Sequence, residues 1–320
     1  MARQIMRLLA LVFALASCKT STSSDHGHLK TDLDTSNSDV AARFERYKSK
    51  QTHCAFDADA AYRVILAGFG PFSGKPVNTS GLIAHNFADF LNHRINTPVI
   101  PMLTNNDMDG ITKQDRVTIN GKNISVCAVT ASVIWDLAGA IYLYEAGLSK
   151  PNLIIMSGMD GKNDYVGTWE SQTKNDAFGK PGFEHDGTGS EVTPNTGGGD
   201  ALIPILPGGA ETLTMSWNPV ELAAMANPTL SRNLHEFSTR NPPDHTPGTY
   251  LCNNVSYVVL AGLSGNDLAL AGGMMTVKSP NLPGTKAGFF HYPWLSPQDG
   301  HAVHEWTNVM AGAIQTILKF

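Results

Sequence analysis

Cys252 stands near the start of an apolar run at residues 248–263, GTYLCNNVSYVVLAGL, whose spacing predicts a helix. The thiolate form of cysteine is the nucleophile, and both a helix N-terminus and a neighbouring imidazole favour that form. The imidazole must come from elsewhere in the fold, and His291, which lies between a short apolar strand and Pro293, is suited to this role. These residues indicate a Cys–His nucleophile, although a buried, unreactive thiol is the commoner state of such a cysteine.

A nucleophile and its base need a third group that orients the imidazole or sets its tautomer. Acidic residues that follow the apolar segment at 151–161 qualify by type, and they are Asp160, Asp164 and Glu170. The residue types alone leave the choice among these three open.

Other chemical motifs along the chain are incomplete. The segment GFGPFSGK at 68–75 has Ser73 where a dinucleotide-binding fingerprint needs its third glycine, and its glycine spacing does not fit a phosphate-binding loop. His301 and His304 lie one helical turn apart and could share a metal ion, but no third ligand is indicated. A solvated or capping role is therefore expected for these two histidines, and the sequence predicts no metal site.

Strands and helices that alternate along the chain must position the candidate residues. Apolar runs predict strands at 62–70, 97–103, 151–161 and 286–292, and Asn120-Gly121 predicts the turn of a β-hairpin. Helical spacing predicts helices at 80–94, 132–148, 218–241 (interrupted near Pro228), 248–263 and 299–319. This alternation predicts an α/β fold, a three-layer α/β/α sandwich with a mostly parallel twisted sheet, as a single catalytic domain.

The composition is that of a globular chain with a sizeable core. Its 320 residues are 42% hydrophobic and 16% charged, which suffices for one large domain or two small ones. The net charge is −5, and Lys and Arg are scattered along the chain, so the charge pattern gives no reason to expect nucleic acid as a partner. The sequence leaves the oligomeric state open.

Residues 1–18, MARQIMRLLALVFALASC, have the layout of a signal sequence, with two arginines, a short apolar run and then small residues. The apolar run is too short for a transmembrane helix. Its end resembles a bacterial lipobox, which implies cleavage before Cys18 and a lipid anchor on that cysteine; an ordinary signal peptide cut elsewhere is the alternative. Lys19 is not the aspartate typical of inner-membrane retention, so we expect a cell-envelope protein, anchored to the outer membrane and facing the periplasm or the cell surface.

A tether is expected to follow the lipid anchor. Residues 19–58 are rich in Ser, Thr and Asp at their start and are predicted to be flexible, with one short amphipathic helix as an option at 39–50. The catalytic domain is then expected to cover residues 59–320.

Three cysteines follow Cys18 in the chain. Outside the cytoplasm an odd number of cysteines leaves one thiol free. One arrangement pairs Cys54 with Cys127 and leaves Cys252 free, but the sequence alone does not establish that bond.

Three blocks of the chain resemble the pyroglutamyl peptidase I (pyrrolidone-carboxylate peptidase) family of cysteine peptidases, in a divergent lipoprotein form. They are VILAGFGPFSGKPVN at 64–78, GTYLCNNVSYVVL at 248–260 and AGFFHYPWLSPQ at 287–298, and they occur in the order that the family has. Weaker similarity connects the blocks, so the resemblance covers about residues 62–320.

This resemblance implies a catalytic triad of Cys252, His291 and Glu170. The thiol would attack the amide carbonyl that follows an N-terminal pyroglutamyl residue, His291 would take and return the proton, and Glu170 would orient His291. The reaction would pass through a thioester acyl-enzyme and would need no metal or organic cofactor.

The resemblance also implies a binding site for the substrate, a peptide with a blocked or pyroglutamyl N-terminus. Phe69 and Phe72 match the phenylalanines that line the pocket of the flat lactam ring, and Asn78 ends the same loop. Backbone N–H groups near the helix start or in the loop at 68–70 would stabilise the oxyanion.

Several positions depart from the family pattern and bear on the substrate. Lys162 and Phe178 replace two arginines of the family, and Met159 stands where the family has a glutamine. The spacing to Glu170 is longer by about two residues, so Asp164 remains an alternative third member of the triad. A further insertion, at 264–286, is expected to shape, cover or enlarge the cleft.

Two other functions therefore stay open. One keeps the Cys–His hydrolase and changes the substrate to another amide or a cell-envelope peptide. The other is a catalytically inactive, surface-tethered binding protein on the same fold.

Overall fold

The computed structural model describes residues 37–71, 76–101, 103, 109–159, 167–176, 204–226, 237–238 and 251–320. Several residues singled out from the sequence lie outside these described ranges: Cys18, Phe72, Asp160, Lys162, Asp164 and Phe178.

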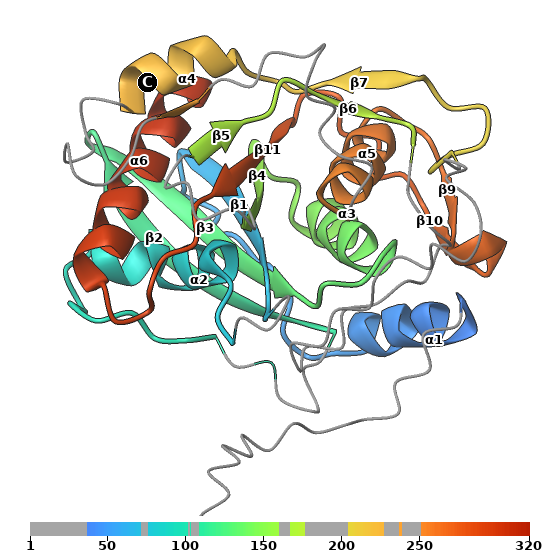
Figure 1. Ribbon diagram of the computed structural model, residues 1–320, viewed down its shortest axis with the longest axis horizontal. Helices are drawn as coiled ribbons and strands as arrows, with labels where there is room; N and C mark the ends of the chain where they lie inside the picture. Colours follow the sequence, from blue (N-terminus) through green and yellow to red (C-terminus); the bar gives the residue numbers. More distant parts are fainter. Residues whose placement is uncertain are drawn as a thin grey trace, which may run out of the picture.

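A seven-stranded sheet forms the centre of the molecule, in the strand order β2-β3-β1-β4-β11-β5-β8 (Figure 1). Its central strands are parallel to one another: β3 (Lys122–Ala131), β1 (Tyr62–Phe69), β4 (Leu153–Met159) and β11 (Lys286–Tyr292). The outer strands are β2 (Gly110–Ile119), antiparallel to β3, β5 (Gly167–Trp169), antiparallel to β11, and β8 (Phe237–Ser238), parallel to β5. The predicted α/β fold with a mostly parallel sheet is thus confirmed.

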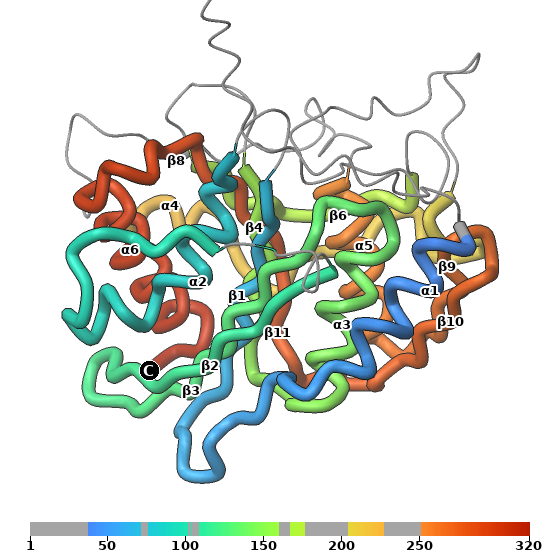
Figure 2. Tube along the Cα trace, turned by 90° about the horizontal axis from the view of Figure 1, so that it is seen from below, coloured from blue at the N-terminus to red at the C-terminus, as the bar shows by residue number. Residues whose placement is uncertain are grey.

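Helices cover both faces of this sheet, as Figure 2 shows in side view. One layer consists of α2 (Thr79–Leu91), α4 (Pro219–Ala226) and α6 (Gly300–Leu318), and the other of α1 (Asn37–Lys48), α3 (Leu137–Ser149) and α5 (Leu251–Leu263). Successive strand residues enter opposite layers, because side chains alternate along a strand. In β1, Val64 and Leu66 pack with α2 and α6, whereas Ile65 and Ala67 pack with α3 and α5.

Two short hairpins lie outside the main sheet. The first pairs β6 (Gln172–Lys174) with β7 (Thr212–Thr214), and the second pairs β9 (Leu268–Leu270) with β10 (Met275–Val277) around the 3-10 turn η2 (Ala271–Gly273). The second hairpin is the insertion predicted at 264–286, and it packs against α1, α3 and α5.

The turn between β2 and β3 follows the sequence prediction. Asn120 and Gly121 have φ angles of 46° and 73°, which are the left-handed values that a two-residue type I′ hairpin requires. Strands β1, β4 and β11 also lie where their apolar runs predicted them.

The predicted strand at 97–103 was wrong for the residues that the structure describes there, because 97–101 form no strand. Pro98 and Pro101 have no N–H to give to a sheet ladder. The Asn86 side chain instead takes the place of a neighbouring strand: its Nδ2 donates to Val99 O, and its Oδ1 accepts from Val99 N, both at 2.7 Å.

The helix predicted at 218–241 with an interruption near Pro228 is present as α4 before that proline, but the prediction was wrong at Phe237–Ser238; residues 227–236 lie outside the described ranges. Helix α4 ends at Ala226, and the backbone of Phe237–Ser238 belongs to β8 of the main sheet. Pro228 accounts for this limit, because a proline disfavours helical backbone angles in the residue before it.

The chain is already packed from Asn37 onward, within the range predicted as a tether at 19–58. Helix α1 corresponds to the optional helix at 39–50, and its buried stripe of Val40, Phe44 and Tyr47 faces α3. The sequence indicated the amphipathic character of this helix, but the polar composition of the residues before it suggested that the whole range is a tether. We call residues 37–56 the N-terminal strap.

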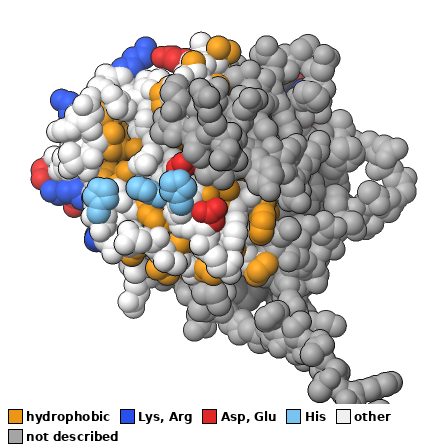
Figure 3. Space-filling view, turned by 60° about the vertical axis from the view of Figure 1, so that its left-hand side comes forward, with side chains coloured by type: hydrophobic (Ala, Val, Ile, Leu, Met, Phe, Trp, Pro, Cys, Tyr) orange, Lys and Arg blue, Asp and Glu red, His pale blue; other side chains and the backbone are white. Residues whose placement is uncertain are grey.

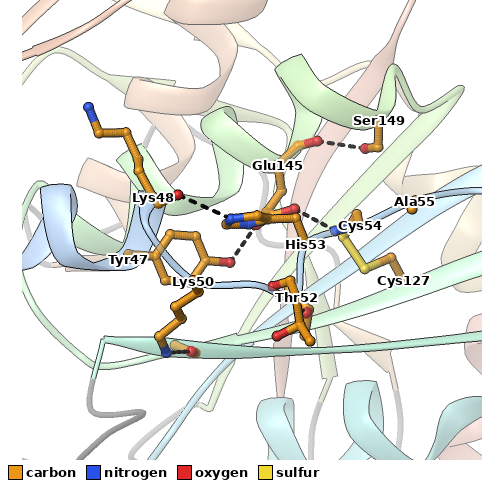
Figure 4. Close-up of polar contacts among 12 residues, drawn as sticks. Tyr47, Lys48, Lys50, Thr52, His53, Cys54, Ala55, Cys127, Glu145 and Ser149 are labelled. Atoms are coloured by element: carbon orange, nitrogen blue, oxygen red, sulfur yellow. Dashed lines mark hydrogen bonds and ion pairs between the residues drawn. A yellow bond between two sulfur atoms is a disulfide. The ribbon is translucent and has the colours of Figure 1, made fainter.

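One buried carboxylate of α3 fastens this strap to the domain (Figure 4). Glu145 is completely buried and accepts hydrogen bonds from Tyr47 Oη (2.7 Å) and Cys54 N (2.8 Å), and it contacts His53 Nδ1 at 2.6 Å. A disulfide between Cys54 and Cys127 joins the strap covalently to β3. The arrangement that the sequence left open is therefore the one in the structure.

Within the described ranges, no helix combines the length and apolar character that crossing a bilayer requires.

Candidate active site

The candidate residues meet at the carboxyl edge of the central strands. Phe69 ends β1, Met159 ends β4, and His291 is the last residue but one of β11. In open α/β sheets ligands bind outside the carboxyl ends of parallel strands, so the topology alone singles out this edge.

Cys252 is the second residue of α5 and the one free thiol among the cysteines that the structure describes. It is partly exposed, whereas its helix neighbours Leu251 and Asn253 are buried. Gly158 of β4 makes room for the sulfur, because a Cβ at this position would lie 2.9 Å from Cys252 Sγ. The thiol thus faces the ends of the strands from the positive end of a helix.

His291 and Glu170 form the ion pair that the resemblance implied. His291 Nδ1 lies 2.9 Å from Glu170 Oε1, and both side chains are largely buried. The backbone of Glu170 is fixed on both sides, since its N–H donates to Phe289 O (3.0 Å) and its carbonyl accepts from Trp217 Nε1 (2.9 Å). Of the two acidic residues that the sequence left as alternatives, Glu170 lies against the imidazole, and Asp164 lies outside the described residues.

The surroundings of His291 act on its pKa in opposite directions. Burial of the imidazole lowers the pKa, but the charge of Cys252 and the hydrogen bonds to Cys252 and Glu170 outweigh burial and raise it to about 10. At neutral pH His291 is therefore protonated, and it lies between the Cys252 sulfur and the Glu170 carboxyl group.

Trp217 is a residue that the sequence analysis missed. Its ring packs against Trp169, with ring centroids 5.3 Å apart, and over Gly288, where a Cβ would lie 2.4 Å from the ring. Its indole N–H holds the Glu170 carbonyl from 47 positions away, and no local motif announces such a contact.

Trp217→Phe is expected to lower kcat about fivefold with little change in KM. The ring packing is retained while one hydrogen bond of about 1 kcal/mol, which orients Glu170, is lost. Steady-state kinetics with a substrate of the enzyme would test this, with the unfolding midpoint measured in parallel. A kcat equal to that of the wild type would show that Glu170 does not depend on this contact.

At the end of β1, two backbone N–H groups that were proposed for the oxyanion already have acceptors within the protein. Phe69 N donates to Ser80 Oγ (3.0 Å), and Gly70 N donates to Ala131 O (2.9 Å). A Cβ at Gly68 would lie 2.5 Å from the Ser80 backbone, so this close contact requires glycine. Of the two sources expected for the oxyanion donors, the start of α5 is therefore the better one.

Phe69 and Asn78 have structural partners in addition to their proposed role in substrate binding. Phe69 is buried, and its ring centroid lies 6.2 Å from that of Tyr142, whose hydroxyl donates to Gly68 O (2.5 Å). Asn78 is the N-cap of α2: its Oδ1 accepts from Ser80 N (3.1 Å) and from Ser80 Oγ (2.8 Å). An asparagine directly before a helix is a capping signal, so this role could have been predicted from the sequence.

A small pocket lies beside the thiol. It is lined by the triad residues and by others that the sequence analysis did not single out: Gln172, Thr173, Met215, Asn253, Ser256 and Phe289. The Ser256 hydroxyl donates to Cys252 O (2.6 Å), an i, i+4 contact that the helical spacing alone would have predicted.

The two histidines of α6 are not among the residues that line the thiol pocket; they border a separate hollow together with His93. Figure 3 shows histidine side chains gathered on one face of the molecule. His301 is exposed and pairs with Glu305 at 3.1 Å, while His304 stacks on Phe90 and meets His93 edge to face. Across the described ranges there is no group of three or more His, Cys, Asp or Glu side chains arranged to hold a metal ion.

Comparisons with known proteins find the fold but no relative in sequence. No protein-family model matches the chain, and no curated protein matches it. The structure of pyroglutamyl peptidase I from Bacillus amyloliquefaciens is 15% identical, with 80% of this chain and 95% of that chain covered at a TM-score of 0.50. A mutant pyrrolidone carboxyl peptidase from Pyrococcus furiosus is 18% identical, with 80% and 98% covered at a TM-score of 0.49. The likeness to the Bacillus structure shows that the chain has the α/β fold of that peptidase.

Proposed function

We propose that this protein is a cysteine peptidase that hydrolyses the amide bond after an N-terminal pyroglutamyl residue. The observation that carries the proposal is the contact of His291 with Glu170 in the pocket that also contains the Cys252 thiol. These three residues come from three separate elements and meet at the edge of the sheet where this fold binds ligands.

The geometry supports the following sequence of steps. The Cys252 thiolate attacks the carbonyl carbon, and N–H groups at the start of α5 stabilise the oxyanion that forms. When the tetrahedral intermediate collapses, the C–N bond breaks and the amine leaves with the proton of His291. A water molecule then gives a proton to His291 and attacks the thioester, which releases the acid and restores the thiolate–imidazolium pair. Glu170 keeps the imidazole in the required orientation throughout.

One observation favours a second candidate, a Cys–His hydrolase of a different amide. Met159 is buried at the end of β4, at the position where the resemblance places a glutamine. A thioether cannot donate a hydrogen bond to a lactam carbonyl, and a polar group left unpaired in a site weakens binding strongly. This position of the chain thus differs in chemistry from the pattern it resembles.

We also propose that the protein acts in the cell envelope, attached to the outer membrane through a lipid on Cys18. The lipobox-like signal supports this, and so does the Cys54–Cys127 disulfide, since disulfides persist in oxidising compartments. Mass spectrometry of the mature protein from membranes would test the anchor: a diacylated N-terminal Cys18 is expected, and an unmodified N-terminus at another residue would overturn it.

The reaction can be tested with two fluorogenic amides that differ only in the ring carbonyl, pyroglutamyl and prolyl. We expect the purified full-length protein to cleave the pyroglutamyl amide and the Cys252→Ala variant to be inactive. Cleavage of neither amide, with Cys252 still hyper-reactive to a thiol probe, would retain the hydrolase and exclude the pyroglutamyl substrate. An unreactive thiol together with no cleavage would overturn the proposal that the protein is an enzyme and would favour the surface-tethered binding protein.

A further inference from the structure

A pair of buried side chains joins the nucleophile helix to the start of α3. Asn254 Nδ2 donates to Asp136 Oδ1 (2.9 Å), and Asp136 N donates to Asn254 Oδ1 (3.1 Å). Asn254 and Asp136 are 2% and 5% exposed, so these reciprocal bonds are shielded from water. Because Asn254 is only two residues beyond Cys252, the pair fixes the helix turn that presents the thiol.

The second carboxylate oxygen of Asp136 ties in the inserted hairpin. Ala271 N donates to Asp136 Oδ2 at 2.8 Å, at the turn between β9 and β10. Asp136 and Ala271 both have positive φ angles, 64° and 49°, which cost energy in residues other than glycine. Burial raises the pKa of Asp136, and the hydrogen bonds from Asn254 and Ala271 oppose that rise.

The opposite flank of the same helix turn is held by the neighbouring asparagine. Asn253 Nδ2 donates to Lys174 O (2.8 Å) and Asp176 O (2.7 Å), and its Oδ1 accepts from Lys174 N (2.8 Å). Strand β6 lies four residues or fewer beyond Glu170 in the sequence, so Asn253 connects the thiol to the acid of the triad. Asn254 then makes the side-chain hydrogen bonds that join this turn to Asp136, the N-cap of α3.

We propose that Asp136 is a positioning residue for the nucleophile, acting through Asn254 and connecting the inserted hairpin to the active site. This rests on the proposed function in that Cys252 is the nucleophile. A helix start that is free to shift would displace the thiol from His291, and misplacement by about 1 Å can lower a rate about a hundredfold.

Exchanging the two residues gives a sharp test. Asp136→Asn alone leaves one side-chain oxygen for two donors, Asn254 Nδ2 and Ala271 N, and turns an amide N–H2 toward one of them. Asn254→Asp alone sets two buried carboxylates against each other. In the double variant the new amide at position 136 donates to the new carboxylate at position 254 and still accepts from Ala271 N. Every donor and acceptor of the wild type is then satisfied again, and the single negative charge is kept.

We would measure the iodoacetamide alkylation rate at Cys252 by peptide mass spectrometry, below the unfolding temperature of every variant, together with kcat and KM. Each single variant is expected to lower the alkylation rate and kcat about tenfold or more, and the double variant to restore both to within about threefold. Asn86→Asp is the matched control, because Asn86 is equally buried, bonds backbone groups, and lies on α2 away from the thiol. It should lower the unfolding temperature without changing the alkylation rate.

The outcomes separate this proposal from the proposed function. Single variants that lose stability but alkylate at the wild-type rate, or a double variant that is not rescued, would overturn the positioning role. A wild-type thiol no more reactive than in unfolded protein would overturn the cysteine nucleophile instead. In that case hydrogen exchange of the first turn of α5 tests the positioning role of the Asp136–Asn254 pair. Faster exchange in the single variants that is restored in the double variant would support this role. Equal exchange in all variants would overturn it.

Discussion

Replacing His291 with alanine is expected to lower turnover about a thousandfold and the alkylation rate of Cys252 at pH 7 about thirtyfold. General acid–base catalysis by a positioned histidine contributes 10²- to 10⁴-fold, and this variant loses it. A cysteine that has no neighbouring imidazolium is about 3% thiolate at pH 7, which sets the size of the expected loss in alkylation rate. Stopped-flow alkylation and steady-state kinetics measure the two effects separately.

His304→Ala is the matched control for this variant. His304 stacks on Phe90 at the surface of α6 and does not contact the thiol pocket. Its removal should leave both rates unchanged. Alkylation of the His291→Ala variant at the wild-type rate would mean that the helix N-terminus alone activates Cys252, and His291 would then be needed only for proton transfer.

The same pair predicts how stability depends on pH. The pKa of His291 is about 10 in the folded protein and about 6.5 in the unfolded chain, so the folded state binds this proton more tightly. Its contribution to the free energy of unfolding is complete below pH 6.5 and is lost as pH rises through 10. The difference in unfolding free energy between wild type and the His291→Ala variant should therefore shrink from pH 6 to pH 10.

Local signals in the sequence sufficed for the residues that stand at the ends of regular elements. Cys252 follows the Pro247-Gly248 dipeptide at a helix start, and His291 lies near the end of an apolar strand, so their elements could be predicted. Glu170 was reached through a family pattern rather than through a local signal. Asp136 and Trp217 were not found, because they act across 118 and 47 positions through contacts that only the folded chain creates.

The strap shows the same limit in another form. Its polar neighbours suggested a tether, whereas packing is decided by three apolar residues at helical spacing and by a partner on α3. The sequence of α3 did not indicate this partner, because a glutamate in a helix is ordinarily exposed, whereas Glu145 is buried. The partners of Glu145 lie more than 90 positions away in the strap, so no short window of the sequence could predict that this side chain is buried.

Glu145→Ala is expected to lower the free energy of unfolding by about 3–5 kcal/mol, the usual effect of removing one partner from a buried ionic contact. The substitution leaves buried donors of the strap, Tyr47 Oη and Cys54 N, without their acceptor, and His53 without its carboxylate. Burial and the Glu145 charge hold the pKa of Tyr47 well above its usual value, so this tyrosine is a hydrogen-bond donor at every pH of interest.

Denaturant unfolding of the oxidised protein would measure the loss, with Glu45→Ala as the matched control on the same strap. Glu45 is exposed and forms a surface ion pair with Lys48, so its removal should change stability by less than about 0.5 kcal/mol. Because the Cys54–Cys127 disulfide keeps the strap near the domain, hydrogen exchange in the Glu145→Ala variant should rise first in α1 and around His53. Protection of α1 equal to that in the wild type would show that its apolar stripe, and not Glu145, holds the strap in place.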